Sequence, residues 1–429
     1  MRAWPRVLLP AVIAMLVTGC ADGPPPEVDE PVVFIGVDSA DWTWIDPLIE
    51  AGRMPNLQGL IEQGTRGPLR SLEPLDKSPT IWTTIATGKR PVEHGVVGFI
   101  DRGGAPSASD MRTAVTYWEI LGHLGRRQAV LGWWVTHPAP PLNGVLVSDF
   151  LPYFDLRTKQ GEDAAYPPQE WEALAPHVVH PEDVDDAMLA RFVDEAVWRA
   201  HGDDADALLA DLRAIVAGDL TYLAMAEALL ARGGFDVFTV YFRGLDLVSH
   251  DYWRWFEPRY SGLEPEDWRV RMLGSVIDEY HVFVDELIGR VLDGVDPRSR
   301  VLVVSDHGFV GHRRVRGRRT LGVQMHRLEG LVVMKGPGLR RGHVLEGGGV
   351  KDVMPTVLAL CGVPPARDLD GVVLHDAFTA DLRRWSGVLV EQSIASYEGI
   401  VPRTGREAEP DPEAEAATLE KLRALGYVD

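Results

Sequence analysis

Short runs of β-branched and aromatic residues alternate along the chain with longer stretches of helical periodicity. Such alternation is typical of a largely parallel sheet covered on both faces, because strands buried on two sides are apolar throughout. The predicted strands are residues 32–37, 129–135, 145–148, 237–242, 301–305 and 331–334. The predicted helices are residues 56–63, 117–124, 204–231, 270–292 and 353–360. The pattern therefore predicts an α/β fold with a mostly parallel sheet sandwiched by helices.

The composition of the sequence changes between residues 151 and 234, where acidic residues and long Ala- and Leu-rich helical stretches replace strand signals. We expect residues 151–234 to form a helical insertion or cap between two halves of one α/β core, which spans residues 31–378. Residues 379–429 are expected to form a C-terminal extension that ends in a short helix at 416–425.

Residues 1–19 have the features of a bacterial lipoprotein signal peptide. Two arginines precede an apolar stretch, residues 7–17, which is too short to span a bilayer but suits a signal core. The sequence VTGC at residues 17–20 resembles a lipobox, whose Cys becomes lipid-modified; an ordinary secretory signal is the alternative. We expect a lipid anchor on Cys20, an extended tether over residues 20–30, and an extracytoplasmic location, periplasmic or at the cell surface.

The composition narrows the class of protein. With 43 Lys and Arg against 63 Asp and Glu, the formal net charge is −20, so binding to nucleic acid is not expected. A hydrophobic content of 45% and 13 Trp exclude disorder for most of the chain. If Cys20 carries lipid, no disulfide is left for the second cysteine, Cys361, which we expect to be a buried structural thiol.

Acidic and imidazole side chains follow three of the predicted strands. In open α/β sheets the chemistry lies at the carboxyl ends of strands, which share one edge. The residues that follow these strands are Asp38, Asp246, His250, Asp306 and His307, and His326 lies in a loop before the next strand. Carboxylates and imidazoles are ligands that divalent cations accept, Zn²⁺ most readily. A single strand-end acid is more often a helix cap, so it is the whole set that predicts a metal site.

Several short motifs accompany these residues in a fixed order. They are GVD at 36–38, SPT at 78–80 with Trp82, TG at 87–88, HG at 94–95, SDHG at 305–308, EG at 329–330, GPG at 336–338, and Asp352 with PT at 355–356. In their order and spacing, residues 31–378 resemble the alkaline phosphatase superfamily, in its type I phosphodiesterase/nucleotide pyrophosphatase-like branch.

The resemblance implies two divalent metal ions, expected to be Zn²⁺. One would be held by Asp246, His250 and His326. The other would be held by Asp38, Asp306 and His307 together with the oxygen of the nucleophile, Ser78. Two such ions stabilise the attacking and leaving oxygens of an in-line displacement.

Ser78 is the candidate nucleophile. Pro79 suits a first helical turn and a serine before it is often only a cap, but the family places its nucleophilic Ser or Thr at this helix N-terminus. Ser78 is the aligned position, and Thr80 is the competing hydroxyl. The resemblance implies hydrolysis through a phosphoseryl intermediate. Lys77 and Arg243 are candidate phosphate contacts, with a solvated or ion-paired role as the alternative.

Two positions depart from related patterns. Trp82 occupies the place of the Arg of the sulfatase motif, so a sulfatase is not expected. Phe99 stands where typical nucleotide pyrophosphatases have an Asn that binds the phosphoryl oxygen, so nucleotide specificity is not implied. We expect a metal-dependent phosphoester hydrolase, more a phosphodiesterase than a monoesterase, acting on a small-molecule or lipid-like substrate. The alternatives are a phosphomonoesterase or a phosphoryl or phosphonyl transferase of the same fold, and a metal-stabilised lipoprotein without catalytic activity.

Overall fold

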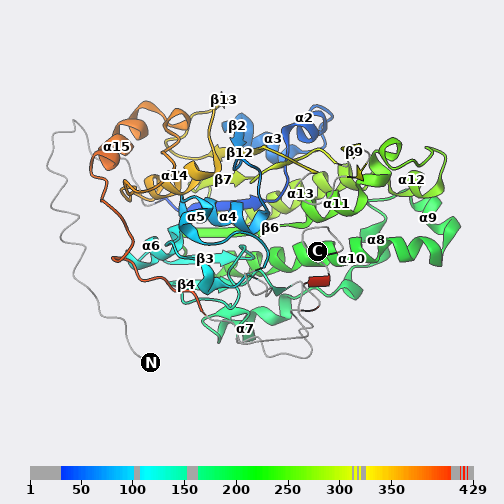
Figure 1. Ribbon diagram of the computed structural model, residues 1–429, viewed down its shortest axis with the longest axis horizontal. Coiled ribbons are helices and arrows are strands. Elements are labelled where there is room, and N and C mark those ends of the chain that lie inside the picture. Colours follow the sequence, from blue (N-terminus) through cyan, green and yellow to red (C-terminus); the bar gives the residue numbers. More distant parts are fainter. Residues whose placement is uncertain are drawn as a thin grey trace.

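The computed structural model describes residues 30–100, 107–151, 163–311, 314–315, 318–319, 325–406, 416, 419–420 and 423 (Figure 1). The predicted signal peptide and all but the last residue of the predicted tether lie outside the described residues. Most of the helix predicted at 416–425 lies outside them as well.

A nine-stranded sheet in the order β13-β2-β12-β7-β1-β6-β3-β4-β5 forms the centre of the described chain. Its strands are β1 (Val32–Val37), β2 (Gly64–Arg70), β3 (Gln128–Leu131), β4 (Gly144–Val147), β5 (Ala165–Tyr166), β6 (Val237–Phe242), β7 (Arg300–Val304), β12 (Glu329–Lys335) and β13 (His343–Val344). Five of its eight neighbouring pairs are parallel. The predicted α/β class with a mostly parallel sheet is confirmed.

Two-stranded pairs lie beside this sheet. They are β8 (Gly308–Phe309) with β11 (His326–Arg327), and β9 (Arg314–Val315) with β10 (Arg318–Arg319), both antiparallel. The pairing of β8 with β11 brings His326 back beside the end of β7, next to His307.

All six predicted strands are present, and those at 32–37 and 237–242 have the predicted bounds. The strand predicted at 129–135 ends earlier, at Leu131, because Gly132 turns the chain with a φ of 71°. Strand β2 was not predicted, since its sequence GTRGPLR holds two Gly and one Pro. It forms through antiparallel pairing with β12 along seven residues, so its partner rather than its propensity decides it.

The α-helices in chain order are α2 (Trp42–Glu50), α3 (Pro55–Glu62), α4 (Ser78–Thr87), α5 (Pro91–His94), α6 (Tyr117–His123), α7 (Glu170–Leu174), α8 (Asp186–Leu189), α9 (Glu195–His201), α10 (Asp203–Arg232), α11 (Gly244–Phe256), α12 (Trp268–Leu273), α13 (Val276–Asp293), α14 (Val353–Leu360) and α15 (Ala380–Glu391). The helix predicted at 270–292 is two helices, α12 and α13, with Gly274 capping the first. Short 3₁₀ turns connect several of these elements.

Helices cover both faces of the sheet. On β1, the side chains of Val33, Ile35 and Val37 pack into a core with α2, α3, α10, α11 and α13. Val32 and Phe34 face the opposite core, formed with α4, α6 and α14. In Figure 1 the sheet runs from β13 and β2 at the top to β3 and β4 below, with α11 and α13 beside it on the right. Successive side chains of a strand alternate between the two faces of a sheet, and β1 lies in the middle of this sheet. Its side chains are therefore buried on both faces.

Helix α10 belongs to the helical layer of the core, because it packs against β6, β3, α11 and α13. Its 30 residues are long and apolar enough to cross a membrane, but 56% of its most apolar 18-residue window is buried inside the protein. That burial is what a core helix shows. The division into core, insertion at 151–234 and C-terminal extension stays a prediction.

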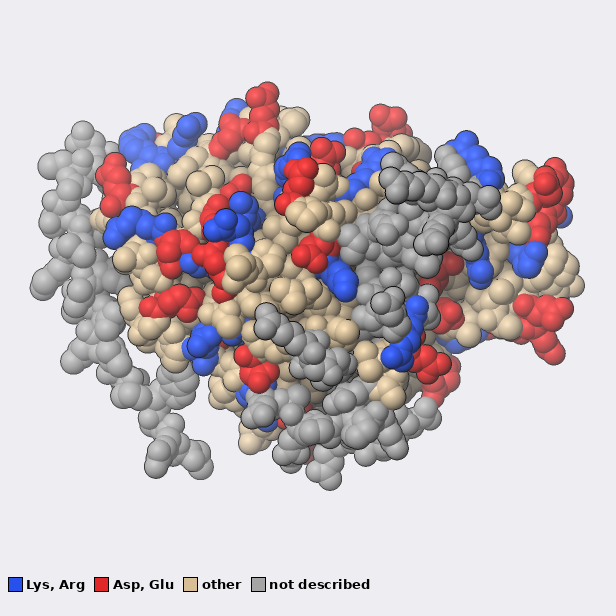
Figure 2. All heavy atoms as spheres, viewed as in Figure 1, with Lys and Arg blue, Asp and Glu red and all other residues tan. Residues whose placement is uncertain are grey.

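On the face shown in Figure 2, Lys and Arg are interspersed with Asp and Glu over the described residues. Cys361 is buried at the end of α14, and burial raises the pKa of its thiol to about 12. The predicted burial of this thiol is therefore confirmed.

Candidate active site

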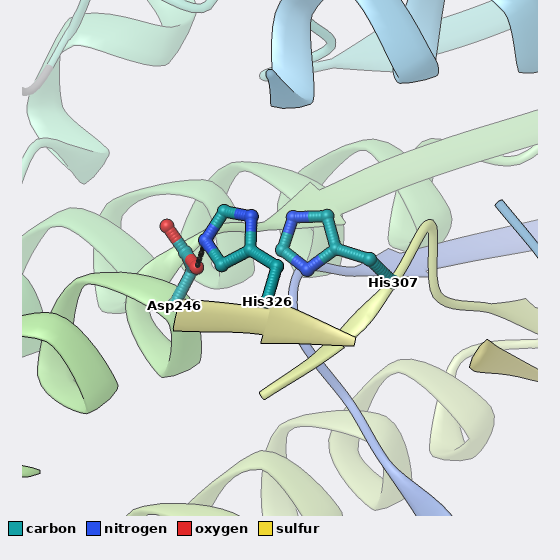
Figure 3. Close-up of side chains that lie close together, drawn as sticks. All are labelled: Asp246, His307 and His326. Atoms are coloured by element: carbon teal, nitrogen blue, oxygen red, sulfur yellow. Dashed lines mark ion pairs between the residues drawn. The ribbon is translucent and has the colours of Figure 1, made fainter. Parts of the chain in front are cut away.

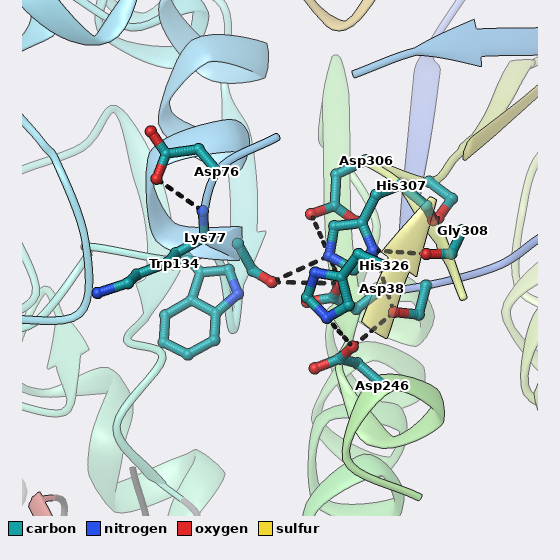
Figure 4. A network of polar contacts seen from close by, with 12 residues as sticks. Asp38, Asp76, Lys77, Trp134, Asp246, Asp306, His307, Gly308 and His326 are labelled. Atoms are coloured by element: carbon teal, nitrogen blue, oxygen red, sulfur yellow. Dashed lines mark hydrogen bonds and ion pairs between the residues drawn. The ribbon is translucent and has the colours of Figure 1, made fainter. Parts of the chain in front are cut away.

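The six predicted metal ligands lie together at the carboxyl edge of the sheet. Each comes from the end of a central strand or from an element that follows one: Asp38 after β1, Asp246 and His250 on α11 after β6, Asp306 and His307 after β7, and His326 on β11. All six are buried. Figure 4 shows Asp38, Asp246, Asp306, His307 and His326 pointing toward one another.

The first ligand group is Asp246, His250 and His326. The Asp246 Oδ1 atom is 3.5 Å from His250 Nε2 and 3.4 Å from His326 Nε2, and the two Nε2 atoms are 2.9 Å apart. Tetrahedral ligands at the usual Zn–N distance lie roughly 3.3 Å from one another. The spacing of these three atoms is therefore that of ligands around one cation.

The second ligand group is Asp38, Asp306 and His307. His307 Nε2 lies 3.4 Å from Asp38 Oδ1 and 3.4 Å from Asp306 Oδ2. The Ser78 hydroxyl joins this group, because its Oγ is 3.5 Å from Asp38 Oδ1 and 3.4 Å from His307 Nε2. The structure thus brings Ser78 to the group in which the resemblance expects it.

The two groups are in direct contact through their imidazoles. The rings of His307 and His326 are stacked, with centroids 3.8 Å apart and an interplanar angle of 15°. Figure 3 shows these rings side by side, with Asp246 beyond His326. Ligand atoms of Asp246, His307 and His326 also lie within 4.8 Å of one another. The site is therefore one continuous cluster rather than two separate ones.

The electrostatics of the cluster favour bound cations. Burial, and then the charge of Asp246, raises the pKa of Asp38; burial, and then Asp38, raises the pKa of Asp306 well above its ordinary range. Neither carboxylate oxygen of Asp306 has a hydrogen-bond partner among the described residues, although both are buried. Buried carboxylates without a donor or countercharge are costly. This donor set therefore fits divalent metal.

The pKa values of Asp246 and His326 are lowered, in contrast to those of Asp38 and Asp306. Burial opposes ionisation of Asp246, but His250 and His326 outweigh it and hold the pKa of that carboxyl well below its ordinary value. Burial, and then the neighbouring His307, lowers the pKa of His326 to about 3. His326 is consequently neutral, which is the form that ligates metal.

Ser78 is the first residue of α4 and is 1% exposed. The N-terminus of a helix carries a partial positive charge that favours a bound phosphate. Thr80, the competing hydroxyl, is buried two positions further along the same turn, and no contact within the described chain joins it to either ligand group. Between the two hydroxyls, the geometry favours Ser78.

The side chains of the two candidate phosphate contacts have neighbours other than the ligand groups. In Figure 4 the side chain of Lys77 points away from the ligand groups. Its ammonium lies against Gly98, where an added Cβ would be 3.5 Å from Nζ. Arg243 donates to the backbone carbonyl of Asp149 and lies over the ring of Trp134, 4.9 Å from the centroid. Neither cation contacts the Ser78 hydroxyl within the part of the chain that the structure describes.

Three residues that the sequence analysis did not single out contact the ligands or support them. Ser39 donates a hydrogen bond to Asp246 Oδ1 at 2.5 Å. Tyr241 donates to Asp38 Oδ2 and accepts from Trp134 Nε1 at 2.7 Å. The only sequence signal for Ser39 is its position after a predicted ligand, and for Tyr241 its position near the end of a predicted strand.

A side chain of α10 caps the N-terminus of helix α11, which carries Asp246 and His250. Asp219 accepts hydrogen bonds from the Gly244 amide at 3.3 Å and from the Tyr280 hydroxyl at 2.8 Å. An added Cβ at Gly244 would lie 1.9 Å from that hydroxyl, so only glycine fits. Burial raises the pKa of Asp219 to about 6. The side chain thus caps α11 from a neighbouring helix, since the helix has no cap of its own.

The loop after β3 holds Trp134 in place under backbone strain. Val135 has a φ of 61°, which is a rare conformation for a β-branched residue. Its amide donates to Asp149 Oδ2 at 3.0 Å, and its carbonyl accepts from Arg112 at 3.0 Å. Such strain persists where surrounding contacts over-determine the backbone, most often at functional sites.

The sheet, the helix N-terminal serine and the Asp and His cluster at the strand ends are together those of the alkaline phosphatase superfamily. Residues 32–362 match the family model of type I phosphodiesterase / nucleotide pyrophosphatase, and the chain belongs to this family.

Solved structures resemble the chain at low sequence identity. A 2-O GAG sulfatase has a TM-score of 0.50 at 12% identity, covering 82% of this chain and 74% of that chain. Human ectonucleotide pyrophosphatase / phosphodiesterase 5 has a TM-score of 0.47 at 10% identity, covering 82% and 100%. Phosphonoacetate hydrolase from Sinorhizobium meliloti 1021 has a TM-score of 0.43 at 16% identity, covering 68% of this chain, which spans only 59% of that one. No curated protein matches the chain significantly.

Proposed function

We propose that the protein is a metal-dependent phosphodiesterase that uses Ser78 as its nucleophile and two divalent cations, expected to be Zn²⁺. The observation that supports this most directly is the position of the Ser78 hydroxyl. It lies at a helix N-terminus and within 3.5 Å of both Asp38 and His307, two members of the second ligand group.

The two ligand groups and Ser78 have different roles in the proposed reaction. Two divalent cations in the two ligand groups would offset the charge of the phosphoryl group and of the attacking and leaving oxygens. Ser78 directs its proton toward Asp38 Oδ1, which leaves a lone pair of Oγ for the phosphorus. Attack by Oγ on phosphorus breaks the bond to the first alcohol, which leaves with the proton of Ser78, and forms a phosphoserine that still carries the second alcohol. Water then hydrolyses the phosphoserine, which releases the phosphomonoester and restores the Ser78 hydroxyl.

An aromatic wall near the site favours a substrate with an apolar group. The ring of Phe99 packs edge-on against Trp134 at a centroid distance of 5.4 Å. Trp134 is half-buried and is joined through Tyr241 to Asp38. Phe99 is buried and stands where typical nucleotide pyrophosphatases have an Asn, so the wall lacks that amide and its partly exposed face is Trp134. A lipid-like or aryl phosphodiester suits this surface better than a nucleotide does.

The proposal includes an extracytoplasmic location with a lipid anchor on Cys20. Its support is the sequence of residues 1–20 and the burial of Cys361, which removes the other cysteine from disulfide pairing. We expect Cys20→Ser to move the protein from the membrane fraction to the soluble extracytoplasmic fraction. Unchanged membrane association of that variant would contradict the anchor. The net charge of −20 supports a substrate other than nucleic acid.

Ser78→Ala tests the nucleophile, and Thr80→Val is its matched control on the same helix turn. We expect the protein to contain two zinc ions and to hydrolyse bis(p-nitrophenyl) phosphate. Ser78→Ala should keep the metal and lose activity by about three orders of magnitude or more, as other catalytic nucleophiles do. Thr80→Val should keep both. A metal-loaded Ser78→Ala with wild-type turnover would rule out Ser78 as nucleophile.

A comparison of substrates separates the remaining alternatives. We expect a higher kcat/KM on bis(p-nitrophenyl) phosphate than on p-nitrophenyl phosphate. The reverse ratio would make the protein a phosphomonoesterase. No hydrolysis of either compound, or of a broader phosphoester panel, by the fully metal-loaded protein would indicate a binding lipoprotein instead.

A further inference from the structure

The hydroxyl of Ser39 lies between the two ligand groups. Its Oγ donates a hydrogen bond to Asp246 Oδ1 at 2.5 Å and lies 3.2 Å from His307 Nδ1. Asp246 belongs to the first group and His307 to the second. Ser39 is 1% exposed, so water does not compete for these contacts. A single buried hydroxyl therefore touches one member of each group.

The direction of these hydrogen bonds follows from their partners. His307 Nδ1 is also 3.2 Å from the carbonyl oxygen of Gly308, which can only accept. A hydrogen on Nδ1 satisfies this carbonyl, and in that tautomer the lone pair of Nε2 faces Asp38 and Ser78, where a cation would bind. Ser39 then accepts from His307 and donates to Asp246. The three side chains form one directed chain of donors, which fixes the tautomer that a ligating imidazole needs.

The backbone at Ser39 is held in an uncommon conformation. Its φ of 62° is in the left-handed region, where glycine is the ordinary choice. Both neighbours are fastened: the Asp38 amide donates to the Phe242 carbonyl at 3.0 Å, and the Ala40 amide donates to Ser305 Oγ at 2.9 Å. A serine at a position suited to glycine is strained, and the hydroxyl contacts are what the side chain adds.

We propose that Ser39 is a positioning residue whose hydroxyl holds Asp246 and His307 in one mutual arrangement, so that the two ligand groups take up their metals together. This inference rests on the proposed metal-dependent function and adds to it the residue that couples the two groups. Loss of a hydrogen-bond partner of a metal ligand lowers metal affinity by about 10–100-fold. Because Ser39 serves both groups, its removal should weaken both sites.

Ser39→Gly tests the proposal, since it removes the hydroxyl and keeps the left-handed backbone. The metal-free full chain is titrated with Zn²⁺ in a calorimeter, for the wild type, Ser39→Gly and Ser39→Ala. We expect two Zn²⁺ per wild-type chain and dissociation constants about 10–100-fold weaker at both sites in either variant. The signal of the His307 Nδ1 proton in the metal-free protein should also move in both variants, which loss of stability alone would not cause.

The matched control is Ser109→Ala. It deletes a buried hydroxyl that donates to the Pro138 carbonyl at 2.8 Å, and metal affinity should stay unchanged. Unaltered zinc affinity in the Ser39 variants, or weakening at one site only, would overturn the coupling and leave the proposed hydrolase intact. A wild-type chain that binds no zinc would overturn the proposed function as well. Should Ser39→Ala fail to fold because of its left-handed backbone, Ser39→Gly gives the same comparison.

Discussion

Removal of the Tyr241 hydroxyl changes the environment of one predicted metal ligand without touching the ligand itself. Tyr241 is fully buried, donates to Asp38 Oδ2, and accepts from Trp134 Nε1 at 2.7 Å. Burial, and then the charge of Asp38, raises the pKa of Tyr241 well above its ordinary value, so the hydroxyl stays a donor at every working pH. Tyr241→Phe therefore leaves Asp38 with the same charge and one donor fewer.

The size of the effect follows from two independent estimates. A hydrogen bond to a charged group contributes about 1.5–3 kcal/mol. Loss of a partner of a metal ligand lowers metal affinity by about 10–100-fold, which equals about 1.4–2.7 kcal/mol. Because the two ranges overlap, we expect Tyr241→Phe to weaken Zn²⁺ binding at the Asp38 group by roughly 30-fold. The first ligand group should keep its affinity, since Tyr241 does not contact it.

The assay is a zinc titration of the metal-free chain, followed by phosphodiester hydrolysis at saturating zinc. Tyr222→Phe is the matched control, because this buried tyrosine donates to the backbone carbonyl of Ser148 at 2.8 Å. That change should lower the free energy of unfolding by about 1 kcal/mol and leave both zinc sites unaltered. A Tyr241→Phe protein with wild-type zinc affinity at both sites would refute the reasoning.

Three further outcomes are expected. The pKa of Asp219 rises from 3.8 to about 6 on folding, so the native state holds a proton that the unfolded chain has lost. The free energy of unfolding should therefore fall by about 3 kcal/mol in all as pH rises from below 3.8 to well above 6. Asp219→Asn should flatten that fall in urea unfolding curves, and an unchanged slope would contradict the assignment. Phe99→Asn should raise kcat/KM for a nucleotide aryl phosphodiester relative to bis(p-nitrophenyl) phosphate, and an unchanged ratio would show that Phe99 does not set specificity. Chelation should abolish hydrolysis and lower the melting temperature, because Asp38 and Asp306 stay buried without countercharge. Added zinc should restore the activity and the melting temperature. A melting curve insensitive to the chelator would argue against a metal in this cluster.

Much of the fold could be predicted because the central strands are buried on both faces. Continuous β-branched runs such as residues 32–37 and 237–242 have no other stable placement, and the structure has them with the predicted bounds. Strand β2 could not be predicted in this way. Its glycines and proline have low strand propensity, and only the adjacent strand β12, distant in sequence, makes it a strand.

The candidate ligands were visible for a related reason. Parallel strands end at one shared edge, so acids and imidazoles that follow three such strands must come close, and Asp38, Asp246 and Asp306 do. The residues that orient them were not visible. Ser39 and Trp134 act through side-chain contacts with residues that are far away in the chain, and no local pattern encodes such contacts.

The roles of Lys77 and Arg243 as phosphate contacts stay predictions, and position in the sequence alone does not decide where their side chains point. Both stand next to key positions in the sequence, one before Ser78 and one at the end of β6. Yet the side chain of Lys77 lies against Gly98, and that of Arg243 is held at Asp149 and Trp134. Apolar periodicity determines which backbone segments are buried, since burial needs only a side chain of the right polarity. Which way a long cation points depends on partners that the tertiary structure alone brings within reach.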